Sequence, residues 1–123
     1  IGGFEGHRSW GTLEPYISMK SWMIGGGCKL TPHIKTGHIF SKRSHHFVPA
    51  YNIIYNKMLV ATLLFENNDR DKLINYLGDS DLLRVSYKKY LENGEWISMK
   101  RQEYQKKMKM TARDYCKKFK IEL

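Results

Sequence analysis

The sequence contains few cysteines, few prolines and no long apolar run. Two of its 123 residues are cysteine and three are proline. Cys28 and Cys116 lie in segments of different character, so neither a disulfide framework nor a Cys-x-x-Cys metal site can be built from them. We therefore expect reduced thiols and a cytoplasmic protein. The longest apolar stretch, at residues 58–65, is far shorter than the roughly 20 residues that cross a bilayer, and we expect no transmembrane segment.

A leader sequence is also missing. The chain opens on Ile1 without an initiator methionine, a basic leader or an apolar signal segment. We expect the sequence to begin inside a longer gene product.

Acidic residues are scarce relative to basic ones. The chain has 21 Lys and Arg residues against 12 Asp and Glu residues, which gives a formal net charge of +9. Such a balance favours anionic partners, including nucleotide diphosphates, nucleic acid and phospholipid surfaces, without distinguishing among them. The basic residues are concentrated in the helical-looking segment 88–120. A hydrophobic content of 41% with 13% aromatic residues indicates a globular domain.

Apolar periodicity and turn residues predict a mainly helical chain with a few short strands. Helices are expected at about 14–24, 51–65, 70–77 and 82–92, with one or two more in 95–120. Residues 28–31 and 34–40 are rich in β-forming residues and are separated by Pro32 and His33, which predicts two short strands or one bent strand. The glycines at 25–27 are better explained as a helix C-cap than as a phosphate-binding loop.

The first two-fifths of the chain carries residues in an order and spacing typical of one enzyme family. The matched residues are Ile1-Gly2, Phe4-Glu5, Trp10-Gly11, Ser18, Lys20, Trp22 and Gly25-Gly26, then Gly37-His38-Ile39-Phe40, Lys42 and Pro49. The spacing between the two tryptophans, and that between His38 and Pro49, equals the family's spacing without a gap. The segment resembles the C-terminal half of the catalytic domain of polypeptide N-acetylgalactosaminyltransferases and related family-2-like glycosyltransferases.

This resemblance implies a fold and a reaction. The fold would be α/β, the C-terminal part of a GT-A nucleotide-diphospho-sugar transferase, mainly helices with a few short strands of a larger mixed sheet. Residues 1–66 would be the acceptor-side part of the catalytic domain, and residues 67–123 a basic helical extension. The enzyme would transfer a hexosyl or N-acetylhexosaminyl group from a nucleotide sugar, such as a UDP-sugar, to a hydroxyl of a glycan or protein acceptor. An upstream half of the same enzyme, absent from this chain, would hold most of the nucleotide.

His38 is the candidate metal ligand that the resemblance implies. In the family, the histidine of the Gly-His-[Val/Ile]-Phe strand joins an Asp-x-Asp or Asp-x-His pair in the upstream half and binds a divalent cation, Mn²⁺ or Mg²⁺. Such a cation stabilises the negative charge of the leaving diphosphate. The alternative is a histidine packed at a strand end with its nitrogens bonded to the backbone. A zinc site formed with the other histidines lacks the expected ligand spacing.

Glu14 is the candidate general base, and it would take the proton from the acceptor hydroxyl. The family's Trp-Gly-Gly-Glu-Asn motif is Trp10-Gly11-Thr12-Leu13-Glu14 here, so the acidic residue is displaced by one position. A glutamate at a helix N-terminus is equally explained by the helix dipole. Trp10 could present an apolar platform to a sugar, next to Gly11, whereas Trp22 is expected in the core.

Lys42, Arg43 and His46 are the candidate diphosphate contacts. The sequence departs from the family at the basic and aromatic positions after His38, and nearby cationic side chains could replace them. The simpler interpretation of His46 is a solvated loop residue.

Two other functions remain open from the sequence. A basic helical module could bind nucleic acid or another polyanion through its lysine-rich tail, although no known nucleic-acid motif is present. Alternatively, the chain could be a degenerate glycosyltransferase that acts only as a structural module.

Overall fold

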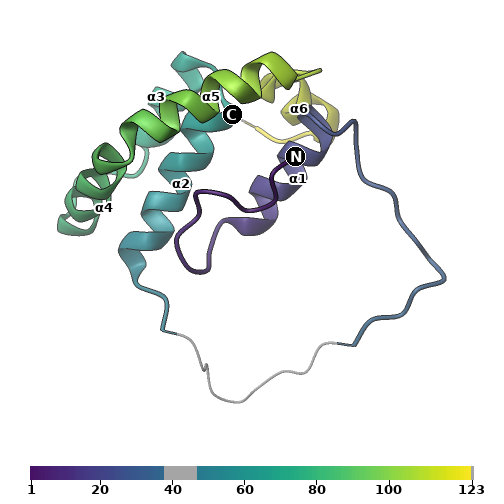
Figure 1. The fold of residues 1–123 in the computed structure, drawn as a ribbon, viewed down its shortest axis with the longest axis horizontal. Coiled ribbons are helices and arrows are strands. Elements are labelled where there is room, and N and C mark those ends of the chain that lie inside the picture. Colours follow the sequence, from purple (N-terminus) through teal and green to yellow (C-terminus); the bar gives the residue numbers. More distant parts are fainter. Residues whose placement is uncertain (38–46, 123) are drawn as a thin grey trace.

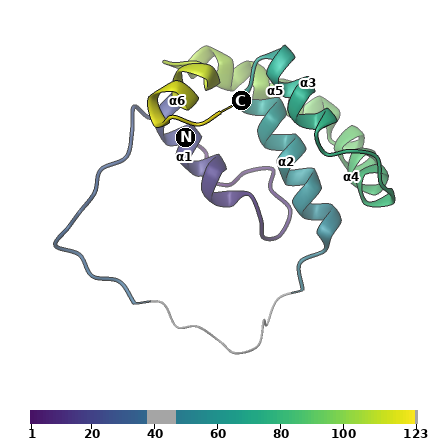
Figure 2. The same cartoon turned by 180° about the vertical axis from the view of Figure 1, so that it is seen from behind.

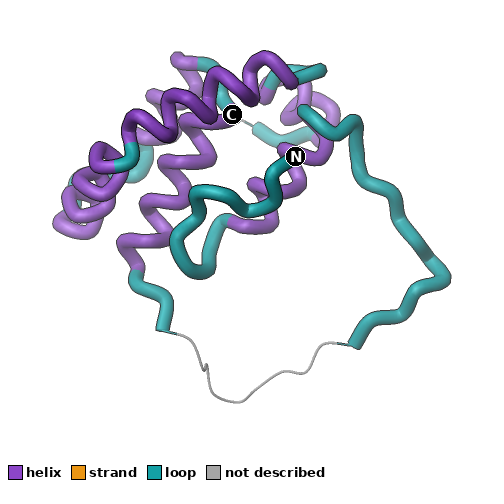
Figure 3. The backbone as a smooth tube through the Cα atoms, in the orientation of Figure 1, coloured by secondary structure: helices purple, strands orange, loops and turns teal. Residues whose placement is uncertain are grey.

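A computed structural model describes residues 1–37 and 47–122, and the regular structure of these residues is entirely helical (Figures 1 and 3). In these two ranges six helices follow one another: α1 Leu13–Met23, α2 Ala50–Leu64, α3 Asn67–Asn75, α4 Asp81–Glu92, α5 Gly94–Lys107 and α6 Ala112–Phe119. The predicted helices at 14–24, 51–65 and 82–92 lie within one residue or so of α1, α2 and α4. The predicted α/β fold is wrong for this part of the chain, because it contains no strand.

The expected strand at 28–31 is an extended, exposed connection, as are the described residues 34–37 of the second expected strand. This connection runs out from the helices in Figure 1. A strand needs a neighbour to bond its backbone N–H and C=O groups, and none lies beside these residues in the described ranges. Residues 38–40 of the second expected strand lie outside the described residues.

Helix α2 is the central element of the fold. It lies between α1 and α4 in both views (Figures 1 and 2), and it packs against α1, α3, α4 and α5. Its last seven residues, 58–64, are all buried. A helix that is apolar on every side is expected at the centre of a helical domain. It ends at Phe65, whose extended backbone leads into α3.

Helix α1 is amphipathic and buries one side. Tyr16, Met19, Lys20 and Met23 recur at the spacing of one helical face and are all buried. The amide of Gly27 bonds the carbonyl of Ser21 at 2.7 Å, and Gly27 has a φ of 132°. These features confirm that the glycines close the C-terminus of α1.

Polar contacts attach α6 to the rest of the domain. Its N-terminus carries a capping box formed by Thr111 and Asp114. Arg113 donates two hydrogen bonds, of 2.6 and 2.9 Å, to the buried carboxylate of Asp69 on α3. These bonds hold the pKa of Asp69 below its usual range. The hydroxyl of Tyr115 lies 3.0 Å from that of Ser18, so α6 is also bonded to α1.

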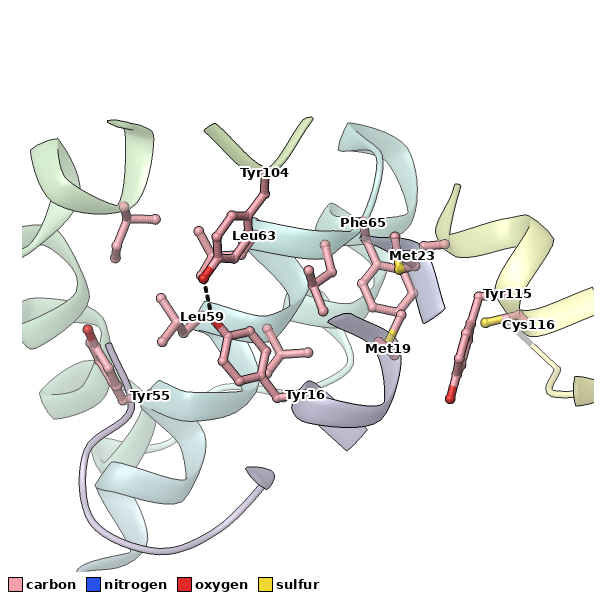
Figure 4. Close-up of a cluster of buried hydrophobic side chains, with 14 residues drawn as sticks. Tyr16, Met19, Met23, Tyr55, Leu59, Leu63, Phe65, Tyr104, Tyr115 and Cys116 are labelled. Atoms are coloured by element: carbon pink, nitrogen blue, oxygen red, sulfur yellow. Dashed lines mark hydrogen bonds between the residues drawn. The ribbon is translucent and has the colours of Figure 1, made fainter. Parts of the chain in front are cut away.

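One buried cluster includes residues of α1, α2, α5 and α6 (Figure 4). Residues from both sides of the predicted boundary at 66 therefore share a core. Trp22, which the sequence analysis assigned to the core, is half-buried and packs edge-on against Phe119 with ring centroids 5.2 Å apart.

Candidate functional site

Residues 1–12 precede α1 and form what we call the N-terminal loop. Three non-glycine residues in the described part of the chain have a positive φ, and two of them, Ser9 (49°) and Thr12 (63°), flank Trp10 and Gly11. A left-handed conformation costs an ordinary L-residue about 1–2 kcal/mol. Such residues persist where the surrounding structure imposes them, and they are concentrated at functional sites.

Asn56 of α2 holds the strained end of this loop. Its side chain is completely buried. Its Oδ1 accepts a hydrogen bond from the Arg8 amide at 2.9 Å, and its Nδ2 donates to the carbonyls of Arg8 at 3.0 Å and Gly11 at 2.9 Å. A Cβ at Gly11 would stand 3.0 Å from Ile53, so the residue lies close against α2. One amide side chain thus satisfies three backbone groups of the loop.

Lys20 of α1 holds the other end of the loop. Its side chain is also completely buried. Its Nζ donates to the Gly3 carbonyl at 2.9 Å, to the Tyr104 hydroxyl at 2.7 Å and to the Tyr16 hydroxyl at 3.4 Å. The two tyrosine hydroxyls lie 3.1 Å apart, as the dashed line in Figure 4 marks. Lys20 therefore joins the loop to α1 and α5.

Glu5 adds a carboxylate to this buried polar group. It accepts a hydrogen bond from the Tyr104 hydroxyl at 2.7 Å and forms an ion pair of 3.1 Å with Lys100. Partial burial raises the pKa of Glu5, but the bonds from Tyr104 and Lys100 together outweigh that effect and lower it. The carboxylate is therefore ionised next to Lys20 at neutral pH.

Burial changes the pKa of the other groups around Lys20. It lowers the pKa of Lys20 to about 8 and raises that of Tyr16 to about 12. The pKa of Tyr104 is also raised, first by burial and then by its bonds to Tyr16 and Glu5. Both tyrosines therefore keep their protons throughout the physiological range.

His7 lies on the same buried surface. Its ring lies against that of Tyr16, with centroids 4.4 Å apart and ring planes tilted by 33°, and neither buried ring nitrogen has a hydrogen-bond partner among the described residues. Burial, together with the nearby charge of Lys20, holds the pKa of His7 below its usual value. The imidazole is therefore neutral at pH 7.

The fixed loop leaves Trp10 and Glu14 at the surface, and we call these two residues with Gly11 the loop edge. The Trp10 side chain is 63% exposed. Glu14 is exposed in the first turn of α1, whose N-cap residue Thr12 makes no side-chain capping bond. A carboxylate and an exposed indole at the end of a rigid loop can accept a proton and pack against the apolar face of a sugar.

The structure places only part of the predicted site. Trp10, Gly11 and Glu14 lie within one short segment, at the end of the N-terminal loop and in the first turn of α1. The candidate metal ligand and the candidate diphosphate contacts, His38, Lys42, Arg43 and His46, lie outside the described residues. Within the described ranges, no three His, Cys, Asp or Glu side chains are grouped so that they could hold a metal ion.

The sequence pattern alone does not indicate the roles of Lys20 and Asn56. Lys20 matches the basic residue of the family pattern, and its position four residues after Tyr16, on the apolar face of α1, is the signal that indicates a buried cation. Asn56 is a polar residue in the first half of a helix that becomes apolar on all sides. Its partners are backbone groups 45 and 48 residues away, which no local pattern identifies.

Comparison with family models, curated proteins and solved structures finds no match for this chain. Among the described residues, no helix has the length and apolar character needed to cross a membrane.

Proposed function

We propose that this chain is the acceptor-side part of a metal-dependent glycosyltransferase that transfers a sugar from a nucleotide-sugar donor to an acceptor hydroxyl. The observation that carries the proposal is the N-terminal loop, in which Asn56 binds Arg8 and Gly11, the residues that precede the strained Ser9 and Thr12, while Trp10 remains exposed. The residues that match the family pattern, in the same sequence order from Ile1 to Pro49, support it independently. An α/β nucleotide-binding fold within the described residues forms no part of the proposal.

In this proposal each residue of the loop edge has one role. Glu14 accepts the proton of the acceptor hydroxyl, and Trp10 packs against the apolar face of the acceptor or donor sugar. Gly11 keeps its φ of 111° and lets the loop lie against α2. Rigid presentation supports catalysis because reacting groups held in position lose little further entropy in the transition state.

The rest of the site would come from outside the described residues. Lys42, Arg43 and His46 would contact the diphosphate. His38 and acidic residues of an upstream half would hold Mn²⁺ or Mg²⁺, which would offset the charge of the leaving nucleoside diphosphate. The chain alone is then expected to leave nucleotide sugars intact.

Substitution of Glu14 by Gln tests the proposal in the enzyme that contains both halves. We expect kcat to fall by about 10²-fold, because general-base catalysis contributes 10²- to 10⁴-fold. The affinity for the nucleotide sugar should not change. Release of the nucleoside diphosphate in the presence of acceptor measures kcat, and calorimetry measures donor binding.

Glu95→Gln is the matched control, since Glu95 is also exposed in the first turn of a helix, α5. It should retain full activity. If Glu14→Gln is as active as the Glu95→Gln control, Glu14 serves only the N-terminus of α1. The general-base assignment then fails.

Exposed lysines of the C-terminal helices favour a second candidate function, polyanion binding. Within residues 106–120, Lys106, Lys107, Lys109, Lys117, Lys118 and Lys120 are all exposed. Lysines contribute to polyanion binding by releasing counterions, so the association constant for duplex DNA should fall linearly with salt on a logarithmic plot.

A charge-matched pair of triple variants tests this second function. Replacing Lys106, Lys117 and Lys120 by Gln should reduce the salt slope for duplex DNA by about 3, one for each lost phosphate contact. The control replaces Lys29, Lys35 and Lys72, which are also exposed. Fluorescence anisotropy measures the affinity. Equal slopes in the two variants would show that only net charge matters and that the C-terminal lysines form no binding surface.

A further inference from the structure

A small apolar pocket opens between α1, α2 and α3. Its volume is about 240 Å³, and its walls include Pro15 and Met19 of α1, Val60 and Ala61 of α2, and Leu73 and Leu77 of α3. Val60, Ala61 and Met19 are buried members of the core, so the inner wall is rigid. The pocket therefore offers a preformed apolar surface to a ligand.

The mouth of the pocket is different in character from its walls. Lys57 of α2 is the only charged residue among the described residues that line the pocket, and it is exposed. Tyr76, at the C-terminus of α3, also lines it and is 90% exposed. The arrangement fits a ligand with an apolar end and an adjacent negative charge.

The size of the pocket limits that ligand. Pockets that enclose drug-sized molecules have volumes of about 300–1,000 Å³. A volume of about 240 Å³ is below that range, so the pocket accommodates a short aliphatic chain or a single ring but not a long lipid.

The pocket also adjoins the loop edge. Thr12 and Pro15 line it, and they are the N-cap and third residue of the turn that carries Glu14. A ligand bound here would lie beside the first turn of α1. Glu14 lies between Thr12 and Pro15 in the sequence, so a ligand in the pocket would place an acceptor near the turn that carries it.

We propose that this pocket binds the short apolar end of an alkyl phosphate monoester, with the phosphate against Lys57, as part of an amphiphilic acceptor. Apolar burial supplies the affinity, and the phosphate fixes the orientation at the mouth. The role as an acceptor rests on the proposed function, whereas the binding itself does not.

Titration of the chain with n-hexyl phosphate tests this inference. Methyl signals of Val60, Ala61 and Leu73 should shift in a saturable manner in ¹³C–¹H spectra, and the same spectra show whether each variant remains folded. Inorganic phosphate, hexanol and hexyltrimethylammonium are the comparison probes. Each should bind at least about threefold more weakly, because each lacks the chain or the negative charge.

Two matched pairs of variants locate the contacts. Tyr76→Ala should weaken hexyl phosphate binding by about fivefold, as the loss of apolar contact at the mouth requires, whereas Tyr87→Ala on α4 should not. Lys57→Gln should weaken it by about threefold, whereas Lys72→Gln should not. All four residues are exposed, so the domain should tolerate these substitutions.

The inference is overturned if hexyl phosphate leaves the three methyl signals unchanged, or if hexyltrimethylammonium binds equally well. Methyl shifts that follow protein concentration instead of ligand would show that a second copy of the chain fills the pocket, which also overturns it. Because these measurements need no activity, their failure leaves the Glu14 test intact. Conversely, if hexyl phosphate binds but Glu14→Gln does not change kcat, the pocket is a binding site and its role as an acceptor site fails.

Discussion

Lys20→Ala should lower the free energy of unfolding by about 3–5 kcal/mol, which is large for a single substitution in a domain of this size. The Lys20 side chain is completely buried, so its removal leaves a cavity. It also removes the hydrogen bonds that the ammonium donates to the Gly3 carbonyl and the Tyr104 hydroxyl, and a hydrogen bond from a charged group contributes about 1.5–3 kcal/mol. Urea denaturation followed by circular dichroism measures the change.

Lys117→Ala is the control, because Lys117 is an exposed lysine of α6. Its effect should stay within about 0.5 kcal/mol. A comparable loss in the two variants would mean that the Lys20 ammonium is hydrated and that its bonds contribute nothing to the fold.

The pH dependence of the free energy of unfolding of the unsubstituted protein reports the charge of Lys20. Its pKa is about 8 in the folded state and 10.5 ordinarily, so the unfolded chain binds more protons between these values. The free energy of unfolding should therefore rise from pH 8 to pH 10, as the cost of the buried charge is relieved. In Lys20→Met this rise should be smaller. The surrounding groups are Glu5, His7, Tyr16, Lys100, Glu103 and Tyr104. Lys20 itself affects the pKa values of Glu5 and His7, but both are lowered from their usual values and lie below this pH range, so the difference between the two proteins reports Lys20.

Asn56→Ala should lower the free energy of unfolding by about 3 kcal/mol. It removes three hydrogen bonds, each worth about 1 kcal/mol, and leaves backbone groups of Arg8 and Gly11 unpaired. Without these bonds to the neighbouring residues, Ser9 and Thr12 would be free to leave their strained backbone conformations. The loop should detach locally, so trypsin should cleave after Arg8 faster than in the unsubstituted protein.

Asn52→Ala is a closely matched control. Asn52 lies one turn earlier on α2 and donates one exposed hydrogen bond, of 3.1 Å, to the Ser9 hydroxyl. The Asn52→Ala substitution should lower the free energy of unfolding by less than about 1 kcal/mol and should not accelerate cleavage after Arg8. If Asn52→Ala and Asn56→Ala behave alike, the loop is fixed by packing and not by the buried amide.

Helices could be predicted from the sequence more reliably than the overall fold. The spacing of Tyr16, Met19 and Met23 is a local signal, and α1 begins and ends where that signal and Gly25–Gly27 place it. The strand at 28–31 was inferred from β-forming residues alone. Such a preference forms a strand only when another strand supplies its hydrogen bonds, and the partner is not a local property.

The candidate site shows the same division. Trp10, Gly11 and Glu14 could be named because they lie within five consecutive residues and belong to one pattern. The bond from Lys20 to Tyr104 joins residues 84 positions apart, and neither residue type indicates the other. The residues that fix the loop can therefore be identified only from the tertiary structure. Its exposed residues could be identified from the sequence.

The order of contacts along the chain has a consequence for folding kinetics. Helices α2 to α5 are consecutive and pack on one another, whereas α1 meets α2 only after the long connection from Ile24 to Pro49 has closed. Closing a longer loop costs more entropy, so contacts between sequence neighbours form earlier. We expect α2 to α5 to assemble first and α1, together with the N-terminal loop, to dock last. The segment that carries Trp10 and Glu14 would then be the last part of the domain to become ordered during folding.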